Sequence, residues 1–160
     1  MATRREAATR GLRPDSEHPW RHQNIGRLLL ASQINWQDAL IRGLRENGFR
    51  NVRASHMNLL RHVDVDGTRI TEIAQRSRLT KQAVGQFLVA CEAQKLVKTS
   101  ADATDGRAKV VTFTKLGKSM IDAEREVMAA IEAQLKELLG ARGYAQLRRS
   151  LGVLAQWSGR

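Results

Sequence analysis

The chain has 160 residues, a length that fits one ordinary domain or a small module with helical attachments. It carries 27 lysine and arginine residues against 16 aspartate and glutamate residues, a formal net charge of +11. This excess of positive charge favours a protein that binds a polyanion over an enzyme whose chemistry depends on acidic residues. The hydrophobic share of 42% excludes disorder throughout the chain, and the single cysteine excludes an intrachain disulfide framework and a cysteine-cluster zinc site.

Residues 1–21 are polar and rich in arginine, and their two prolines disfavour helix, so we expect a flexible N-terminal arm. No apolar run in the chain approaches the ~18 residues needed to span a bilayer. The early arginines are not followed by the hydrophobic core of a signal peptide. We therefore expect a cytoplasmic protein with no membrane partner.

A long helix and a shorter one are expected next. Apolar residues recur at helical spacing over about residues 24–47, and Gly48 supplies a C-terminal stop. The second helix is expected to begin with Ser55 as its N-cap and to run through Val63. The following Asp-Val-Asp-Gly run, residues 64–67, is typical of a loop.

The middle of the chain predicts two short helices and a β-hairpin. Thr71 is expected to open the first helix and Thr80 to cap the second. The second helix has one apolar stripe at helical spacing, formed by Val84, Phe87, Leu88 and Cys91. Two short β-rich segments, residues 96–99 and 109–113, flank a polar turn at residues 102–107, which is the pattern of a hairpin.

The C-terminal third predicts two helices separated by glycines. Thr114 is expected to begin a long helix that reaches about residue 139. Gly140 and Gly143 are expected to break it, and apolar residues recur at helical spacing again over residues 144–157.

The positive charge is concentrated in the middle of the chain. Residues 69–118 hold ten basic and four acidic side chains, a net of +6, which is more than half of the total. A solvated basic face would be the simpler interpretation of such a segment. The pattern of residues within it favours nucleic acid.

Residues 70–88 have the pattern of a helix-turn-helix. Ala74 is small where two short helices must cross closely, and Leu79 and Val84 are expected to fill the space between them. Removing the apolar stripe leaves Lys81, Gln82, Gly85 and Gln86 facing outward. Glutamine can pair with adenine through two hydrogen bonds, and lysine can reach guanine or phosphate, so this helix suits reading of the DNA major groove.

Four segments resemble the MarR family of bacterial transcriptional regulators: Leu79–Val84, Lys95–Val97, Asp105–Lys109 and Thr114–Gly117. The resemblance spans about residues 25–157. It implies a homodimer that binds a pseudo-palindromic double-stranded DNA operator. Such proteins are mostly repressors that are released by a small aromatic or phenolic ligand, and sometimes by oxidation.

The resemblance also assigns residues of the hairpin, the wing of this fold. Arg107 takes the position of the wing-tip arginine that enters the minor groove. Asp105 matches the acidic residue that pairs with an arginine and orders the wing, and Lys109 would add a phosphate contact. Arg78 stands where the family often has glycine. If that residue is left-handed, arginine costs roughly 1 kcal/mol relative to glycine, which a phosphate contact could offset.

These inferences define one architecture. We predict a mainly α winged helix-turn-helix with a two-stranded β-wing and long N- and C-terminal dimerisation helices. Its parts are an N-terminal arm (1–21), an N-terminal dimerisation helix (22–52), a DNA-binding domain (53–113) and C-terminal dimerisation helices (114–160). The predicted DNA contacts are Arg76, Arg78, Thr80, Lys81, Gln82, Gln86, Arg107 and Lys109.

A candidate effector pocket follows from the same resemblance, because the ligand crevice of the family lies where the first helices meet the DNA-binding domain. We predict that His22, Trp36, His56 and Met57 line it, with His22 or arginines engaging an anionic group. The alternative is that Trp36 packs in the dimer core.

Other functions remain open at this point. The charge alone permits a non-sequence-specific architectural DNA-binding protein. Cys91 could act as a redox sensor, although its place on the apolar stripe favours packing. His18 and His22 lack a third ligand, and Pro19 lies between them, so we expect no metal and no cofactor. No catalytic motif is present, and an enzyme is the class that the sequence favours least.

Overall fold

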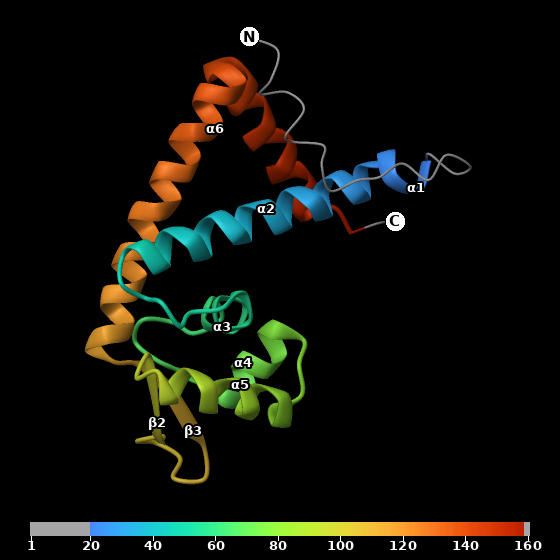
Figure 1. The fold of residues 1–160 in the computed structure, drawn as a ribbon. Helices are drawn as coiled ribbons and strands as arrows, with labels where there is room; N and C mark the ends of the chain where they lie inside the picture. Colours follow the sequence, from blue (N-terminus) through green and yellow to red (C-terminus); the bar gives the residue numbers. More distant parts are fainter. Residues whose placement is uncertain (1–19, 159–160) are drawn as a thin grey trace. The chain divides into compact units, whose positions relative to one another are not determined.

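The computed structural model describes residues 20–158, except for the side chain of His22. The predicted arm at residues 1–21 therefore lies almost wholly outside the described residues. The helices and strands are, in chain order, α1 (Trp20–Gln23), α2 (Ile25–Glu46), α3 (Ala54–Leu60), β1 (Thr68–Arg69), α4 (Ile70–Ser77), α5 (Lys81–Ala93), β2 (Val97–Ala101), β3 (Lys109–Phe113) and α6 (Lys115–Gln156) (Figure 1). The chain divides into two units, Met1–Asp38 and Ala39–Arg160, and each is described by itself.

In the first unit, Asn24 separates α1 from α2. Its side-chain oxygen accepts a hydrogen bond from the backbone N–H of Arg27 at 3.0 Å, and its side-chain amide donates to the carbonyl of Trp20 at 2.8 Å. An asparagine that accepts from the third residue after it is a standard helix N-cap. The predicted start of the long helix near residue 24 is therefore confirmed.

The hydrophobic core lies in the second unit. It is formed by the end of α2, by α3, α4 and α5, by the sheet, and by the first half of α6. Its fully buried side chains are Leu44, Val52, Leu59, Ile73, Val84, Cys91, Leu96, Val111 and Met120. Gly43 of α2 faces Val127 of α6 so closely that a Cβ on Gly43 would lie 2.5 Å from a methyl carbon of Val127. These two helices therefore pack against each other at the glycine.

The sheet has three antiparallel strands in the order β1-β3-β2, rather than the two that the sequence predicts. β1 pairs with β3 through Thr68 opposite Val111 and Arg69 opposite Val110. A strand of two residues is too short to show an alternating pattern, so β1 has no signal in the sequence. The hairpin itself is confirmed, with β2 paired to β3 from Val97 opposite Phe113 to Ala101 opposite Lys109.

Two of the predicted helix starts are wrong. Ser55 lies inside α3, whose N-cap is Arg53, and the helix ends at Leu60 instead of continuing to residue 63. The backbone N–H of Arg53 donates to the side-chain Nδ1 of His56 at 3.3 Å, so a histidine at the third position of the helix satisfies the N–H of the N-cap residue. α4 begins at Ile70, one residue before the predicted Thr71.

The predicted caps of α5 and α6 are confirmed. The hydroxyl of Thr80 accepts from the backbone N–H of Ala83 at 3.1 Å, and that of Thr114 accepts from Gly117 at 3.0 Å. Each threonine thereby satisfies one of the four backbone N–H groups left free at a helix start.

The long C-terminal helix bends where glycine was predicted to break it. Gly140 has non-helical dihedral angles (φ 71°, ψ 161°), and the chain reverses direction there (Figure 1). Gly143 lies within helix, so the predicted break is made by Gly140 alone. The hydroxyl of Tyr144 donates to the carboxylate of Glu132 at 2.8 Å, which joins the segments before and after the bend.

Candidate nucleic-acid interface

The turn between α4 and α5 is built on a left-handed residue. Arg78 has φ 55° and ψ 32°, and its side chain is exposed. Its backbone N–H donates to the carbonyl of Gln75 at 3.2 Å, and the N–H of Leu79 donates to Ala74 at 3.0 Å. Arg78 is therefore left-handed, the case in which arginine is less stable than glycine, because glycine adopts this conformation without a Cβ penalty. Leu79 is 40% exposed, so the prediction that it fills the space between the helices is wrong.

The exposed face of α5 carries the predicted reading residues. Lys81, Gln82 and Gln86 are exposed, whereas Val84 and Leu88, on the opposite face, are buried. With its N-terminus capped by Thr80, the helix presents three long polar side chains to solvent from its first two turns. This arrangement matches the geometry with which a helix contacts base edges in the major groove.

Gly85 lies on the same face of α5. Apart from the adjacent helix backbone, a Cβ at this position would meet no atom within 4 Å, so no close packing contact explains a glycine in the middle of the helix. Glycine there costs about 1 kcal/mol relative to alanine. A small residue instead allows another molecule to approach the helix backbone closely.

The wing turn is held by local hydrogen bonds. The carbonyl of Asp105 accepts from the N–H of Ala108 at 2.8 Å, and its carboxylate accepts from the N–H of Arg107 at 3.1 Å. The N–H of Asp102 closes the turn by donating to Ala108 at 2.9 Å. The side chains of Arg107 and Lys109 are exposed, as a groove or phosphate contact requires.

The arginine that orders the wing pairs with Asp102, not with the predicted Asp105. The Nε of Arg69 donates to the carboxylate of Asp102 at 2.6 Å. That carboxylate also accepts from the N–H of Thr104 at 2.7 Å and from its hydroxyl at 2.6 Å. The hydrogen bond from Arg69, followed by those from Thr104, holds the pKa of Asp102 well below its usual range. The Asp-x-Thr pattern of Asp102 and Thr104 is typical of a turn held by an aspartate side chain, and it could have indicated that Asp102 orders the wing.

Arg76, a predicted DNA contact, is engaged within the protein. Its guanidinium forms ion pairs with Asp64 at 2.8 Å and with Glu72 at 2.5 Å, and it donates to the carbonyl of His62 at 3.2 Å. The carboxylate of Asp64 also accepts from the hydroxyl of Thr68 at 3.2 Å. These bonds fix α4 against the loop that precedes β1. A DNA contact of Arg76 remains a prediction.

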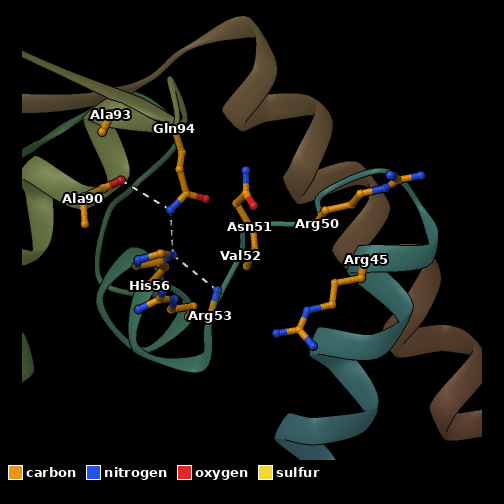
Figure 2. A pocket seen from close by; sticks show the side chains of 9 residues that line it. All are labelled: Arg45, Arg50, Asn51, Val52, Arg53, His56, Ala90, Ala93 and Gln94. Atoms are coloured by element: carbon orange, nitrogen blue, oxygen red, sulfur yellow. Dashed lines mark hydrogen bonds between the residues drawn. The ribbon is translucent and has the colours of Figure 1, made fainter.

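The four residues predicted to line an effector pocket have different surroundings. His56 is 5% exposed and lines a cavity, whereas Met57 is buried in the hydrophobic core. Trp36 is half-buried in the first unit, and the side chain of His22 lies outside the described residues. A cavity is thus described at His56 (Figure 2), and an effector-binding role of the four residues remains a prediction.

Cys91 is fully buried, and burial together with Glu92 raises the pKa of its thiol to about 11. Because the thiolate is the form that reacts with oxidants, this environment opposes redox sensing and agrees with a packing role. Within residues 20–158, no group of His, Cys, Asp and Glu side chains is arranged to hold a metal ion. No helix in that range is long and apolar enough to cross a bilayer.

No protein-family model matches the chain. One curated relative, the uncharacterised HTH-type transcriptional regulator YxaD of Bacillus subtilis (strain 168), is 34% identical over 89 residues. The matched region is 54% of this chain and 62% of the relative, so the chain spans less than two thirds of that protein.

Solved structures resemble the chain over most of its length. The transcriptional repressor CouR, bound to a 23-mer DNA duplex, has a TM-score of 0.66 at 19% identity, covering 87% of this chain and 97% of CouR. Wild-type MarR of E. coli in its apo form has a TM-score of 0.65 at 16% identity, covering 82% of this chain and 96% of MarR. The predicted fold, a mainly helical winged helix-turn-helix resembling the MarR family, is confirmed.

Proposed function

We propose that this chain, whose fold is that of the MarR-family regulators, is a DNA-binding transcriptional regulator and not an enzyme. The observation that carries the proposal is the exposed face of α5, where Lys81, Gln82 and Gln86 follow a capped helix start. Residues 69–118 also carry a net charge of +6, and this positive charge attracts the negatively charged phosphates of DNA.

In this proposal α5 enters the major groove and the wing lies along the adjacent minor groove. Gln82 and Gln86 contact base edges, and Arg107 enters the minor groove, where a narrow A·T-rich segment attracts a guanidinium. Lys109 and Arg78 contact phosphates on either side. The N-terminus of α5 adds its own attraction for a phosphate.

We propose further that the protein acts as a homodimer on a pseudo-palindromic operator. Exposed apolar side chains support this assembly. On α1 and the N-terminal part of α2 they are Trp20, Ile25, Leu28, Leu29, Leu30 and Ile34, and on α6 they are Leu138, Leu139, Leu147, Leu151, Val153 and Leu154. Apolar faces of this kind are usually covered by a partner. A dimer of this chain carries two reading helices, one from each copy, which would enter successive major grooves about 34 Å apart.

We propose finally that the protein represses transcription and that a small ligand releases it from its operator. A bound regulator blocks transcription by occupying its operator. A ligand that binds better to a dimer with another helix spacing lowers DNA affinity by linkage.

The test is DNA selection followed by substitution. A duplex enriched from random sequences by the full-length protein is titrated with the Gln82→Ala and Gln86→Ala variants, using fluorescence anisotropy. Each variant is expected to lose about 1–3 kcal/mol of discrimination at one base position. Equal losses on enriched and random duplexes would instead indicate phosphate contacts only, the behaviour of an architectural DNA-binding protein.

Arg107→Ala provides a separate measurement on the same duplex. Removing one phosphate-neutralising cation should reduce the slope of log affinity against log salt concentration by about one. An unchanged slope would show that Arg107 of the wing does not contact DNA phosphate.

A further inference from the structure

One exposed apolar side chain lies on the face of α5 that carries the two glutamines. Val89 is 66% exposed, whereas Val84, the other valine of this helix, is fully buried. Val89 follows Gln82 by seven residues and Gln86 by three, so the three side chains lie along one face of the helix. DNA-reading helices contact bases from positions with this spacing, i, i+3, i+4 and i+7.

Gly85 occupies the i+3 position of the same set and leaves this face open. Apart from the adjacent helix backbone, a Cβ there would meet no atom within 4 Å. Residues four apart are neighbours on a helix surface, so the open surface at Gly85 lies directly beside Val89. A group that protrudes from a base into the major groove can therefore approach the backbone at Gly85 and contact the methyl groups of Val89.

The chemistry of Val89 selects one such group. A valine side chain neither donates nor accepts hydrogen bonds, so it cannot read the polar edge of a base. Among the groups that base pairs present in the major groove, the C5-methyl of thymine is the apolar one. Contact between this methyl group and Val89 removes apolar surface of both from water. Valine in a helix occupies mostly one χ1 rotamer, so the contact costs little side-chain entropy.

Exposure alone does not indicate such a contact, because single exposed apolar residues are common on protein surfaces. Val65 is a comparable case, 54% exposed, but it lies in the loop before β1, between Asp64 and Asp66. What distinguishes Val89 is its position on α5, beside Gly85 and in line with the two glutamines.

We propose that Val89 and Gly85 together recognise the methyl group of a thymine, which makes Val89 a specificity-determining residue of α5. This rests on the proposed function and adds to it, since the glutamines contact polar base edges whereas Val89 requires a methyl group. Three residues advance a helix by about 4.5 Å, and successive base pairs are about 3.4 Å apart. The thymine is therefore expected about one or two base pairs from the base that Gln86 contacts.

The test first removes the methyl group from the DNA. In the duplex enriched by the full-length protein, each thymine is replaced in turn by deoxyuridine, which keeps the base-pairing groups and lacks only the methyl. Fluorescence anisotropy should identify a thymine whose replacement weakens binding by about threefold to tenfold, as expected for one buried methyl group. At that position 5-bromodeoxyuridine, whose bromine is close to a methyl group in size, should restore binding.

The test then removes the valine. Because Val89 is exposed and alanine is the better helix former, Val89→Ala should fold. The variant should bind the enriched duplex about threefold to tenfold more weakly than the wild type. Deoxyuridine should then weaken binding by less than about twofold, because valine and methyl are partners in one contact and their effects are not additive. The matched control is Val65→Ala, which should keep the wild-type affinity and the full effect of deoxyuridine.

The proposal is overturned if no thymine is sensitive to deoxyuridine, if Val89→Ala retains the full deoxyuridine effect, or if Val65→Ala loses it as well. It is also overturned if the sensitive thymine lies far from the base at which Gln86→Ala loses discrimination. Failure of the proposed function has a different result, an enriched duplex that binds no better than a random one. A strong preference for the enriched duplex without a deoxyuridine effect contradicts the Val89 contact alone.

Discussion

Arg69 of β1 donates a 2.6 Å hydrogen bond to Asp102 at the base of the wing turn, 33 residues further along the chain. Arg69 immediately precedes α4, and Asp102 immediately follows β2. This ion pair therefore joins the helix-turn-helix to the wing and sets the position of Arg107 relative to α5.

Arg69→Ala is expected to act through the wing. Without its partner, the wing should lose its fixed position, and the contribution of Arg107 to DNA affinity should fall with it. A double-mutant cycle on DNA binding checks this, because residues in one network give non-additive effects. We expect Arg69→Ala to weaken binding by roughly threefold to tenfold in the wild-type background and by much less with Arg107→Ala.

Arg125→Ala is the control for this cycle, because Arg125 forms an exposed ion pair with Asp122 at 3.6 Å within α6. It should leave DNA affinity unchanged. Additive effects of Arg69→Ala and Arg107→Ala would contradict a role of Arg69 in placing the wing.

The left-handed conformation of Arg78 gives a second prediction. Arg78→Gly should raise the free energy of unfolding by about 1 kcal/mol, since glycine adopts φ 55° without a Cβ penalty. The same change should reduce the salt slope of DNA binding by about one if the guanidinium contacts a phosphate. Arg78→Lys keeps both the charge and the Cβ, so it should change neither quantity appreciably. Denaturant titration and anisotropy provide the two readouts, and an Arg78→Gly protein with lower stability would refute the first part.

Gly85 predicts opposite effects on stability and on binding. Gly85→Ala should stabilise the protein by about 0.5–1 kcal/mol, because alanine favours helix and the added methyl meets no atom within 4 Å. On the enriched duplex the methyl group stands on the same face as Gln82 and Gln86, and affinity should fall. Thermal unfolding and anisotropy measured on one preparation check both signs. Unchanged affinity would mean that the α5 backbone does not closely approach DNA.

The lowered pKa of His56 predicts a pH dependence of stability. A histidine whose pKa is lower in the folded than in the unfolded protein costs stability only when it is protonated, so the loss begins as pH falls below about 6.5 and increases through the folded pKa. His56→Gln retains an acceptor for the N–H of Arg53 but does not titrate. Between about pH 7.5 and pH 5.5 the wild type should therefore lose more stability than the variant.

His62 also has a lowered pKa, caused by burial and then by Arg61 and Arg76. It is present in both proteins, so the difference between their denaturation curves isolates His56. Parallel pH profiles of the two proteins would contradict the assignment.

The parts of the fold that follow from local pattern could be predicted from the sequence. Thr80 and Thr114 are caps because a hydroxyl three residues before a free N–H is a local arrangement. The buried stripe of α5 follows from helical spacing, with Val84 and Leu88 inside and Gln82 outside.

The parts that depend on distant residues could not be predicted in this way. The choice of Asp102 over Asp105 as the partner of Arg69 is decided by where β1 pairs in the sheet, and two residues give no periodic signal. The cavity at His56 likewise joins α2, α3 and α5, which are separated in the chain. The spacing of residues within one helix does not show which other helices it contacts in the folded protein.

Gly117 is a case in which the resemblance identified a residue and the structure supplies the reason. The Thr-x-x-Gly motif was assigned by likeness to a family. In the structure a Cβ on Gly117 would lie 1.9 Å from the carbonyl oxygen of Leu96, and the hydroxyl of Thr114 donates to the carbonyl of Lys95 at 2.5 Å. The motif therefore packs the start of α6 directly against the chain that enters the wing.

The central claim is that α5 and the wing read a particular DNA sequence. The most direct measurement is the ratio of dissociation constants for a random-sequence duplex and for the duplex enriched by selection, both determined with the wild-type protein at one physiological salt concentration. We predict a ratio of about a thousand or more, as expected of a protein that reads base edges. A ratio near one would contradict the claim and would leave only attraction between the basic surface and phosphate.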